Sequence, residues 1–344
     1  MMSVETFPPA MEQSPFACKY GQEDGHLSAA TTQQSESSGT RAEHIKVVVR
    51  VRPFLEIEDP RQTSVVVSPD ETPGGRPTTL KVVRDKPIVF GKFDAVLGPE
   101  CKQEDVYDQV HECVEAAMKG TNVSIFAYGQ TNAGKTYTMM GPPHYSYASK
   151  AVKQRMVHED FAEESLPLRG VIPRFLMELL SSTRKDDMDI KIEASFLQVY
   201  NERVLDLLAE ASSKQQQPAL ELRCGDRGVG EIQVVGNVKR SITCLSDVFD
   251  ILHQGVKQRK VCETTHNERS SRSHTILQLM LTITTRGEAS PSSVSHSKIS
   301  LVDLAGSERW VQHDDRADKN NAANKAHKEE MSNINRSLMT LGRV

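Results

Sequence analysis

The chain has 344 residues, of which 38% are hydrophobic and 26% charged, and it is therefore long enough to bury a substantial core. No apolar run reaches the roughly 18 residues of a membrane span, and the N-terminus lacks the basic patch and apolar core of a secretory signal. The formal net charge of -4 belongs to residues 1–43, which carry two basic and six acidic side chains, so bulk charge gives no support for nucleic-acid binding.

The first elements follow from composition and apolar spacing. Residues 1–43 are rich in Ser, Thr, Gln, Glu and Pro without an apolar period, which predicts a disordered arm. From Ile45 to Val51 every second residue is apolar until Pro53 stops the run, which predicts a strand with a buried face. The next predicted elements are short strands at 79–84 and 88–93, then one helix from Val106 to Ala117 that Gly120 ends.

A glycine-rich loop follows an apolar strand and opens onto a helix start. The loop reads Gly129-Gln-Thr-Asn-Ala-Gly-Lys-Thr136, the apolar run before it is 123–128, and Tyr137 begins the next segment. This is the context that a phosphate-binding loop requires, because glycines let the backbone N–H groups point inward around phosphates. Lys135 would reach the β and γ phosphates and the Thr136 hydroxyl would bind Mg2+. The pattern predicts a nucleoside triphosphate site.

Beyond the loop, the polar and aperiodic segment 142–169 predicts a surface insertion. The remaining pattern alternates between the helical period and the strand period. It predicts, in order, a helix at 171–180, a strand at 188–200, a short helix at 201–208, strands at 219–223 and 231–235, a helix capped by Ser246, strands at 277–284 and 298–302, a polar loop at 310–328, and a helix from about 329 with Met331, Ile334, Leu338 and Leu341 on one face.

Two polar stretches are placed to face the phosphate loop. The strand at 298–302 ends in Asp303, and a carboxylate at the carboxyl end of a strand can hold the shell of a magnesium ion. Leu304-Ala-Gly-Ser-Glu-Arg309 follows it, with a glycine N–H that could meet a γ phosphate. Asn267-Glu-Arg-Ser-Ser-Arg-Ser-His274 precedes a strand and could present hydroxyls and an arginine. Taken singly, either stretch is also consistent with an ordinary turn or a solvated loop.

Together these residues resemble the motor domain of the kinesins. Arg50-Val-Arg-Pro53 resembles the family's RxRP segment, Tyr128 to Thr136 its YGQTxxGKT loop, and Asn267 to His274 its NxxSSRSH switch I. Asp303 to Arg309 matches the DLAGSER switch II at every position. Phe196 to Leu208 and Ile334 to Gly342 also resemble family stretches. The resemblance covers about residues 44–344 and implies an α/β P-loop NTPase whose mixed central β-sheet has helices on both faces.

The resemblance also implies a role for each matching position. Gly129, Gln130, Thr131, Asn132, Ala133, Gly134, Lys135, Thr136 and Tyr137 would hold ATP, with Arg52 and Pro53 beside the adenine. Thr136, Ser271 and Asp303 would serve Mg2+, with Asp303 acting through the metal's water shell. Ser270 would position the attacking water, the Gly306 N–H would sense the γ phosphate, and Arg272 would pair with Glu308, which would accept the proton through water. The implied partner is tubulin in microtubules.

The chain also departs from the family pattern. Residues 310–328 differ from the Gly/Thr-containing loop and RLKE-like helix start that kinesins usually have. Asp314, Asp315 and Asp318 would repel the acidic surface of tubulin, while Lys319, Lys325, Lys328 and Arg336 would attract it. Kinesin motors also continue into further tubulin-binding helices, a strand between the first strand and the phosphate-loop strand, and a neck linker. We therefore expect a motor domain over 44–344 that lacks its C-terminal part. A gap in the sheet would leave backbone groups unpaired, so poor stability is predicted.

The sequence thus predicts a kinesin-like ATPase of the cytoplasm that associates with microtubules. The six cysteines (18, 101, 113, 224, 244 and 262) lack metal-ligand spacing and agree with reduced cytosolic thiols. One alternative is a non-motile nucleotide switch or microtubule-binding remnant. A second is a GTPase, but the only candidate for a guanine-reading NKxD motif, which begins at Asn324, lacks its Asp. A nucleic-acid module and a membrane protein are disfavoured by charge and by apolar pattern.

Overall fold

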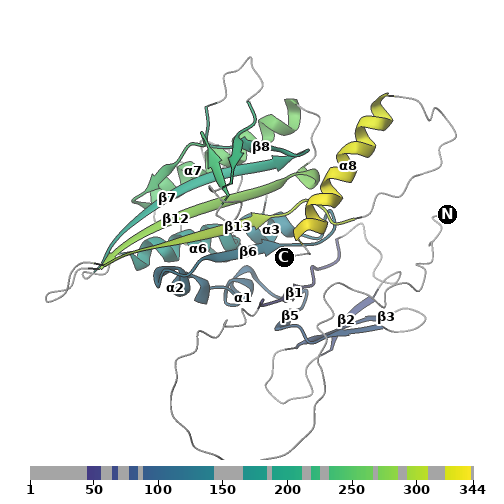
Figure 1. The fold of residues 1–344 in the computed structure, drawn as a ribbon. Coiled ribbons are helices and arrows are strands. Elements are labelled where there is room, and N and C mark those ends of the chain that lie inside the picture. The colour runs from purple at the N-terminus through teal and green to yellow at the C-terminus, as the bar shows by residue number, and fades with distance from the viewer. Residues whose placement is uncertain are drawn as a thin grey trace, which may run out of the picture.

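The computed structural model describes residues 45–55, 64–68, 77–83, 88–142, 166–183, 188–210, 218–224, 232–265, 270–285, 293–308 and 322–341 (Figure 1). The predicted arm at 1–43, most of the predicted insertion at 142–169, and residues 309–321 of the polar stretch lie outside these ranges. Among the described helices, none combines the length and apolar character needed to cross a membrane.

The described elements alternate between strands and helices along the chain. The strands are β1 (Val48–Arg50), β2 (Ser64–Ser68), β3 (Thr79–Val83), β4 (Ile88–Gly91), β5 (Ala95–Leu97), β6 (Val123–Ala127), β7 (Met188–Tyr200), β8 (Arg203–Asp206), β9 (Glu221–Arg223), β10 (Gln233–Val235), β11 (Arg240–Ile242), β12 (His274–Thr285) and β13 (Ser293–Asp303). The helices are α1 (Gln103–Tyr107), α2 (Glu112–Met118), α3 (Lys135–Met140), α6 (Val171–Ser182), α7 (Leu245–Thr265) and α8 (Ala322–Leu341), with short 3-10 turns η2 (Leu166–Leu168) and η3 (Ser270–Arg272).

A mixed six-stranded sheet forms the centre of the molecule. Its order is β11-β7-β12-β13-β6, with β8 paired to β7; β13 and β6 run parallel, and the other pairs are antiparallel. The parallel pair places the carboxyl ends of β6 and β13 at the same edge, since Ala127 pairs with Asp303. The phosphate loop and the segment after Asp303 therefore begin side by side.

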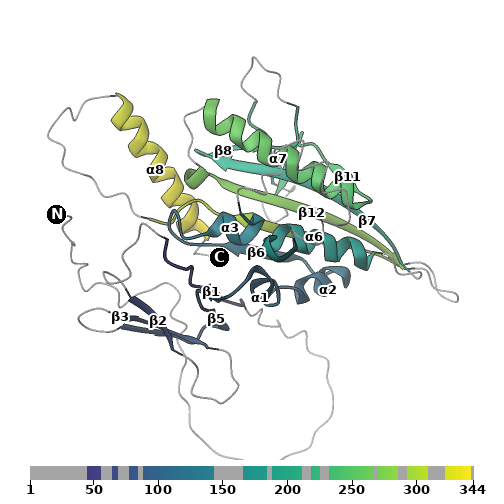
Figure 2. The same cartoon turned by 180° about the vertical axis from the view of Figure 1, so that it is seen from behind.

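Helices lie on both sides of this sheet. Figure 2 shows α3, α6 and α7 together on one face, with α2 below them. In Figure 1, α8 lies on the opposite side, beside the ends of the central strands. The predicted α/β fold with a mixed central sheet and helices on both faces is confirmed.

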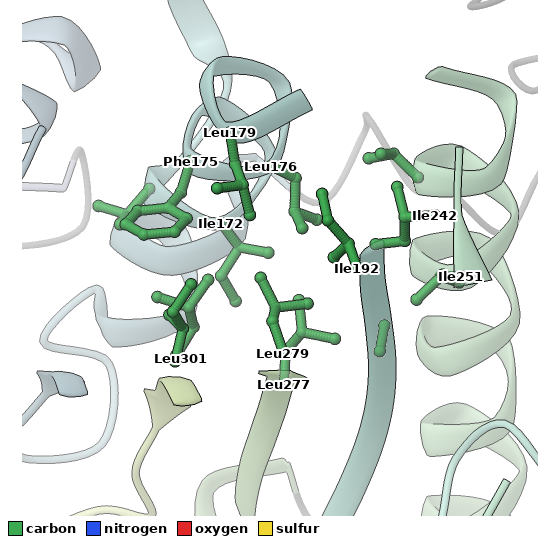
Figure 3. Packing of buried hydrophobic residues seen from close by; sticks show 14 of the residues in the cluster. Ile172, Phe175, Leu176, Leu179, Ile192, Ile242, Ile251, Leu277, Leu279 and Leu301 are labelled. Carbon is green, nitrogen blue, oxygen red and sulfur yellow. The ribbon is translucent and has the colours of Figure 1, made fainter. Parts of the chain in front are cut away.

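The core lies between the sheet and the α6–α7 layer. On β12, Leu277, Leu279 and Leu281 are fully buried while the residues between them are partly exposed, as the alternation in the sequence predicts. Figure 3 shows Leu277 and Leu279 directed toward Ile172 and Leu176 of α6. Gly255 of α7 lies so close to the Phe196 ring of β7 that a Cβ there would collide with it. The glycine therefore lets α7 approach the sheet closely.

Three predictions of local structure are wrong. Residues 201–208 do not form a helix: Asn201 and Glu202 have φ of +47° and +59°, values suited to a tight hairpin turn, and β8 then pairs with β7. The single helix predicted at 106–117 is two helices, because Gln109 and Val110 make hydrogen bonds to residues three positions earlier and tighten the turn. Helix α8 begins at Ala322 rather than near 329. Its first turns contain Ala and Lys residues, which favour a helix but give no apolar period in the sequence.

Besides the central sheet, the described residues form three smaller sheets, one of which is the antiparallel pair of β9 and β10. The other two lie beside the central sheet (Figure 1). Strand β1 pairs in parallel with β5, and β2, β3 and β4 form an antiparallel sheet. In the part of the chain that the structure describes, β6 is the edge of the central sheet and β1 pairs with β5 alone. No strand joins β1 to β6 within these ranges, which is the position where a gap was expected.

Candidate functional site

The phosphate loop connects β6 to α3 as predicted. Asn132 and Gly134 have φ of +65° and +97°, left-handed values that turn successive N–H groups toward the inside of the loop. The Ala133 N–H donates to the Gln130 carbonyl at 3.1 Å, which closes the turn, and Gly134 stands immediately before the first residue of α3. The loop backbone therefore has the inward-facing form that receives an anion at a helix N-terminus.

Lys135 lies across this loop. Its Nζ donates to the carbonyls of Gly129 and Gln130, both at 2.9 Å. Burial lowers the pKa of the ammonium, while the nearby carboxylates of Asp303 and Glu308 act in the opposite direction. The charge of Lys135 is thus held against the loop by bonds to neutral backbone carbonyls rather than by an ion pair at contact distance.

A hydroxyl and a carboxylate meet beneath the loop. Thr136 Oγ1 donates to Asp303 Oδ2 at 2.7 Å, and the Asp303 side chain is buried. Asp303 Oδ1 is also buried, and it has no hydrogen-bond partner. Because a buried carboxylate oxygen without a partner is costly, its presence indicates a place for a ligand that supplies positive charge or a donor.

Arg259 is a residue of this site that the sequence analysis did not identify. It extends from α7, and its Nη1 lies 3.2 Å from Asp303 Oδ2, with both side chains largely buried at 11% and 4% exposure. The signal was present in the sequence, since Arg259 follows Val248, Leu252 and Val256 at helical spacing and so lies on the apolar stripe of α7. A charged residue on a buried stripe usually has a charged partner.

The segment after Asp303 is held by four consecutive backbone donors. Leu304 N–H donates to the Ala127 carbonyl at 3.3 Å, Gly306 N–H to the Ser271 carbonyl at 2.7 Å, and Ser307 N–H to the Gly129 carbonyl at 3.1 Å. The remaining donor, Ala305 N–H, meets Nδ1 of His274 at 3.1 Å. Two predicted site residues, Gly306 and Ser271, are therefore bonded to each other. Gly306 is also packed so closely that a Cβ there would collide with Thr131 and Glu308.

The predicted ion pair between Arg272 and Glu308 is not formed. Arg272 Nη1 lies 2.8 Å from Glu330 Oε2 on α8. Glu308 instead accepts hydrogen bonds from the N–H of Thr131, at 2.8 Å, and from the Thr131 hydroxyl. Burial raises the pKa of Glu308, but the Thr131 bonds and the charge of Lys135 outweigh it, so the pKa is below its ordinary value. The predicted partner Glu308 and the observed partner Glu330 both lie far from Arg272 in the sequence, so no local pattern distinguishes them.

Switch I residues contribute backbone and side-chain groups from η3. Ser270, Ser271 and Arg272 form this turn, with Ser271 and Arg272 half-buried. His274, two residues after the turn, is buried, and burial lowers the pKa of its imidazole. The site therefore brings Ser271, Asp303, Gly306 and Glu308 together beside the phosphate loop. Arg272 instead bonds to Glu330 of α8.

The segment that contains the expected adenine-side residues contacts α3 through Arg50. Arg52 Nη1 donates to the carbonyl of its neighbour Pro53 at 3.1 Å. The residue that contacts Tyr137 is Arg50, whose guanidinium lies 5.2 Å from the ring centroid and also donates to Thr138 Oγ1 at 3.0 Å. Tyr137 is 39% exposed, so its ring has a free surface as well as the surface that Arg50 covers.

Comparison with known proteins gives a consistent result. The family model described as the kinesin motor domain matches residues 50–344. Kinesin-like protein KIN-5D of Arabidopsis thaliana is 30% identical over 327 residues, covering 92% of this chain and 29% of the relative. Kinesin-like protein KIF11 of Xenopus tropicalis is 31% identical over 323 residues, covering 92% of this chain and 28% of the relative. The chain thus spans less than a third of the length of these relatives.

Solved structures show the same likeness. A fast kinesin, whose structure was discussed for its ATPase mechanism and interactions with microtubules, aligns with a TM-score of 0.63 at 28% identity, covering 83% of this chain and 71% of that one. The motor domain of a Kar3-like kinesin from Ashbya gossypii aligns with a TM-score of 0.62 at 24% identity, covering 87% and 78%, and supports the fold alone.

Proposed function

The chain belongs to the kinesin motor domain family, and from this premise we propose that it binds and hydrolyses MgATP and couples hydrolysis to microtubule binding and movement. The chain spans under a third of its curated relatives, so the activity of the whole protein is part of this proposal. Its place of action would be the microtubule cytoskeleton of the cytoplasm, with tubulin as partner.

One observation carries the proposal. Thr136 Oγ1 lies 2.7 Å from Asp303 Oδ2, and the buried Asp303 Oδ1 has no partner. A hydroxyl and a carboxylate oxygen beside a phosphate loop are the hard oxygen donors that Mg2+ prefers. The residues present therefore fit the ion, which Thr136 and Ser271 would hold directly and Asp303 through water. Magnesium bound there would neutralise negative charge on phosphate oxygens.

The loop residues would hold and orient the phosphates. The loop backbone from Gly129 to Gly134 would surround them, and Lys135 would exchange its two carbonyl acceptors for phosphate oxygens. Those carbonyls are neutral, so the ammonium gains by moving to an anion. Tyr137 would receive the base on its exposed surface, with Arg52 and Pro53 nearby and Arg50 behind the ring.

The switch residues would complete the site by moving. The Gly306 N–H donates to the Ser271 carbonyl in this structure, so it must leave that acceptor before it can donate to a γ phosphate. Ser270 would position the attacking water. The lowered pKa of Glu308 keeps its carboxylate ionised, which is the form that accepts a proton, and Glu308 would do so after releasing Thr131.

The test is a nucleotide titration of the purified chain followed by turnover. We expect a fluorescent ATP analogue to bind in the presence of Mg2+, to be displaced by ATP far more readily than by GTP, and to be hydrolysed faster when microtubules are added. Displacement by GTP at equal or lower concentration would favour the GTPase alternative. Nucleotide binding without microtubule gliding would favour the non-motile switch and would contradict the motility part of the proposal.

A further inference from the structure

His274 connects the segment 304–307 to helix α8. Of the four consecutive donors in that segment, three donate to backbone carbonyls and one, Ala305 N–H, donates to the His274 side chain. The other ring nitrogen, Nε2, lies 2.7 Å from Ser337 Oγ on α8. Ser337 Oγ in turn donates to the Ile334 carbonyl, one turn earlier in the same helix, at 2.7 Å.

These contacts determine where each proton lies. Nδ1 accepts from the Ala305 N–H, so it carries no hydrogen. In a neutral imidazole the proton is then on Nε2, which donates to Ser337 Oγ. Ser337 keeps its own hydrogen for the Ile334 carbonyl. Every donor in this series of hydrogen bonds therefore has one acceptor, and the bonds run in one direction from the segment 304–307 to α8.

We propose that His274 is a positioning residue that couples the segment 304–307 to α8 through this directed chain of hydrogen bonds. The proposal rests on the proposed function, in which the same segment responds to the γ phosphate. It adds a path from that response to a helix whose other side-chain hydrogen bonds to described residues outside the helix come from Glu330 and Asn333.

The geometry gives the path its physical basis. Ala305 and Gly306 are consecutive, so a shift that frees the Gly306 N–H from Ser271 must also displace the Ala305 N–H. His274 is buried beside the end of β13 and cannot exchange this donor for bulk water without cost. The ring must follow Ala305 or lose the bond, and either event changes the bond at Ser337. A buried chain of this kind has two discrete arrangements rather than a continuum.

Three variants distinguish the two ends of the hydrogen-bond series, at Ala305 and at Ser337. Ser337→Ala removes the acceptor on α8 and leaves the helix backbone intact. His274→Asn keeps an acceptor near the Nδ1 position but cannot reach Ser337, and His274→Gln keeps a donor near the Nε2 position but loses the acceptor for Ala305. Ser332→Ala is the matched control, because Ser332 is an exposed serine on the same helix.

The readout is amide hydrogen exchange of the whole chain without nucleotide. We expect Ser337→Ala to speed exchange within 304–307 by about fivefold, the effect of one ordinary hydrogen bond, and Ser332→Ala to leave it unchanged. His274→Gln should speed exchange at Ala305 at least as much. Because His274→Asn and Ser337→Ala cut the same bond, the double variant should resemble the single ones. Adding Mg2+ and a non-hydrolysable ATP analogue should alter exchange in α8 of the unmodified chain and much less in Ser337→Ala.

Equal exchange of 304–307 in Ser337→Ala and Ser332→Ala overturns the inference, as does additivity of the double variant. Ser337 is half-buried on α8, and alanine there is smaller and a better helix former. A loss of structure would speed amide exchange, so it cannot produce equal exchange in the two variants. Because the first readout contains no nucleotide, it is independent of ATP binding. A chain that fails to bind ATP but shows the Ser337 effect refutes the proposed function and supports the coupling.

Discussion

The two halves of the candidate site are held in different ways. The phosphate loop is fixed largely by itself: Lys135 bonds to Gly129 and Gln130, and Ala133 bonds to Gln130, all within a few residues. The switch half is fixed by contacts between distant elements. Glu308 bonds to Thr131 at a separation of 177 residues, and Arg272 bonds to Glu330 at a separation of 58. A locally fixed half keeps its shape when the other half moves.

This difference explains how the site can bind and respond at once. The loop backbone has a turn that is set within the loop by the left-handed residues Asn132 and Gly134. The switch segments have bonds that can be exchanged one for another, because each is a single contact between elements. Substitutions that break contacts in the fixed half should therefore affect nucleotide binding, and those in the switch half should affect the response to it.

The largest expected effect is from Lys135→Ala. It removes the only positive side chain placed over the loop among the residues that the structure describes, so ATP turnover should fall by about a hundredfold or more. The fall should appear both in the affinity for a fluorescent MgATP analogue and in microtubule-stimulated hydrolysis. Lys119→Ala, which removes an exposed lysine from an ion pair with Glu115, is the control. Turnover within a few-fold of the unmodified chain would show that the loop is not the phosphate site.

The next effect tests the support beneath the loop. Arg259→Met should lower the free energy of unfolding by about 3 kcal/mol, because it leaves the buried Asp303 carboxylate without its cationic partner. Chemical denaturation measures this value. Lys257→Met places the same side chain at an exposed position of α7 and should be nearly neutral. If the double variant Arg259→Met, Asp303→Asn is no more stable than Arg259→Met alone, the buried pair is not the cause.

The locally fixed half of the site can be predicted from the sequence more fully than the half that depends on contacts between distant elements. The phosphate loop, its strand and its helix start are local patterns, and all three are observed where expected. Asp303 is also placed correctly, because the parallel pairing of β13 with β6 brings it opposite Ala127. The partner of Arg272 was predicted wrongly, since the choice between Glu308 and Glu330 depends on how α8 packs, which no local pattern encodes.

The same reasoning applies to the fold. Strands and helices with a clear apolar period, such as β12 and α6, were predicted close to their observed bounds. β8 was taken for a helix because Val204, Leu205, Leu207 and Leu208 form an apolar cluster without a decisive period. Its pairing with β7 is decided by the turn at Asn201 and Glu202, where two non-glycine residues adopt positive φ. Tertiary pairing here overrides local preference.

A third effect concerns the switch half alone. Glu330→Gln should lower the free energy of unfolding by about 1–2 kcal/mol, since it removes the charge that Arg272 faces in a half-buried site. Tyr200→Phe removes only the bond from the Tyr200 hydroxyl to Glu330 Oε1 and should have the smaller effect. Affinity for a MgATP analogue should change less in both variants than in Lys135→Ala. A loss of affinity as large as that of Lys135→Ala would contradict the division into two halves.

The smallest expected effect is at the contact that joins the halves. Thr131→Val removes the hydroxyl that donates to Glu308 and keeps the backbone donor, so it should cost about 1 kcal/mol of stability near neutral pH. The pKa of Glu308 is lowered in the folded chain, so the stability that its carboxylate contributes is complete above the ordinary glutamate pKa and is lost as the pH falls through the folded value. The difference in stability between Thr131→Val and the unmodified chain should therefore shrink as the solution is acidified through that range.

Thermal melts at a series of pH values measure this difference, with Thr121→Val, at an exposed position, as the control. A difference that stays constant on acidification would mean that the Thr131 hydroxyl stabilises the fold without Glu308, and the two halves would then be joined elsewhere.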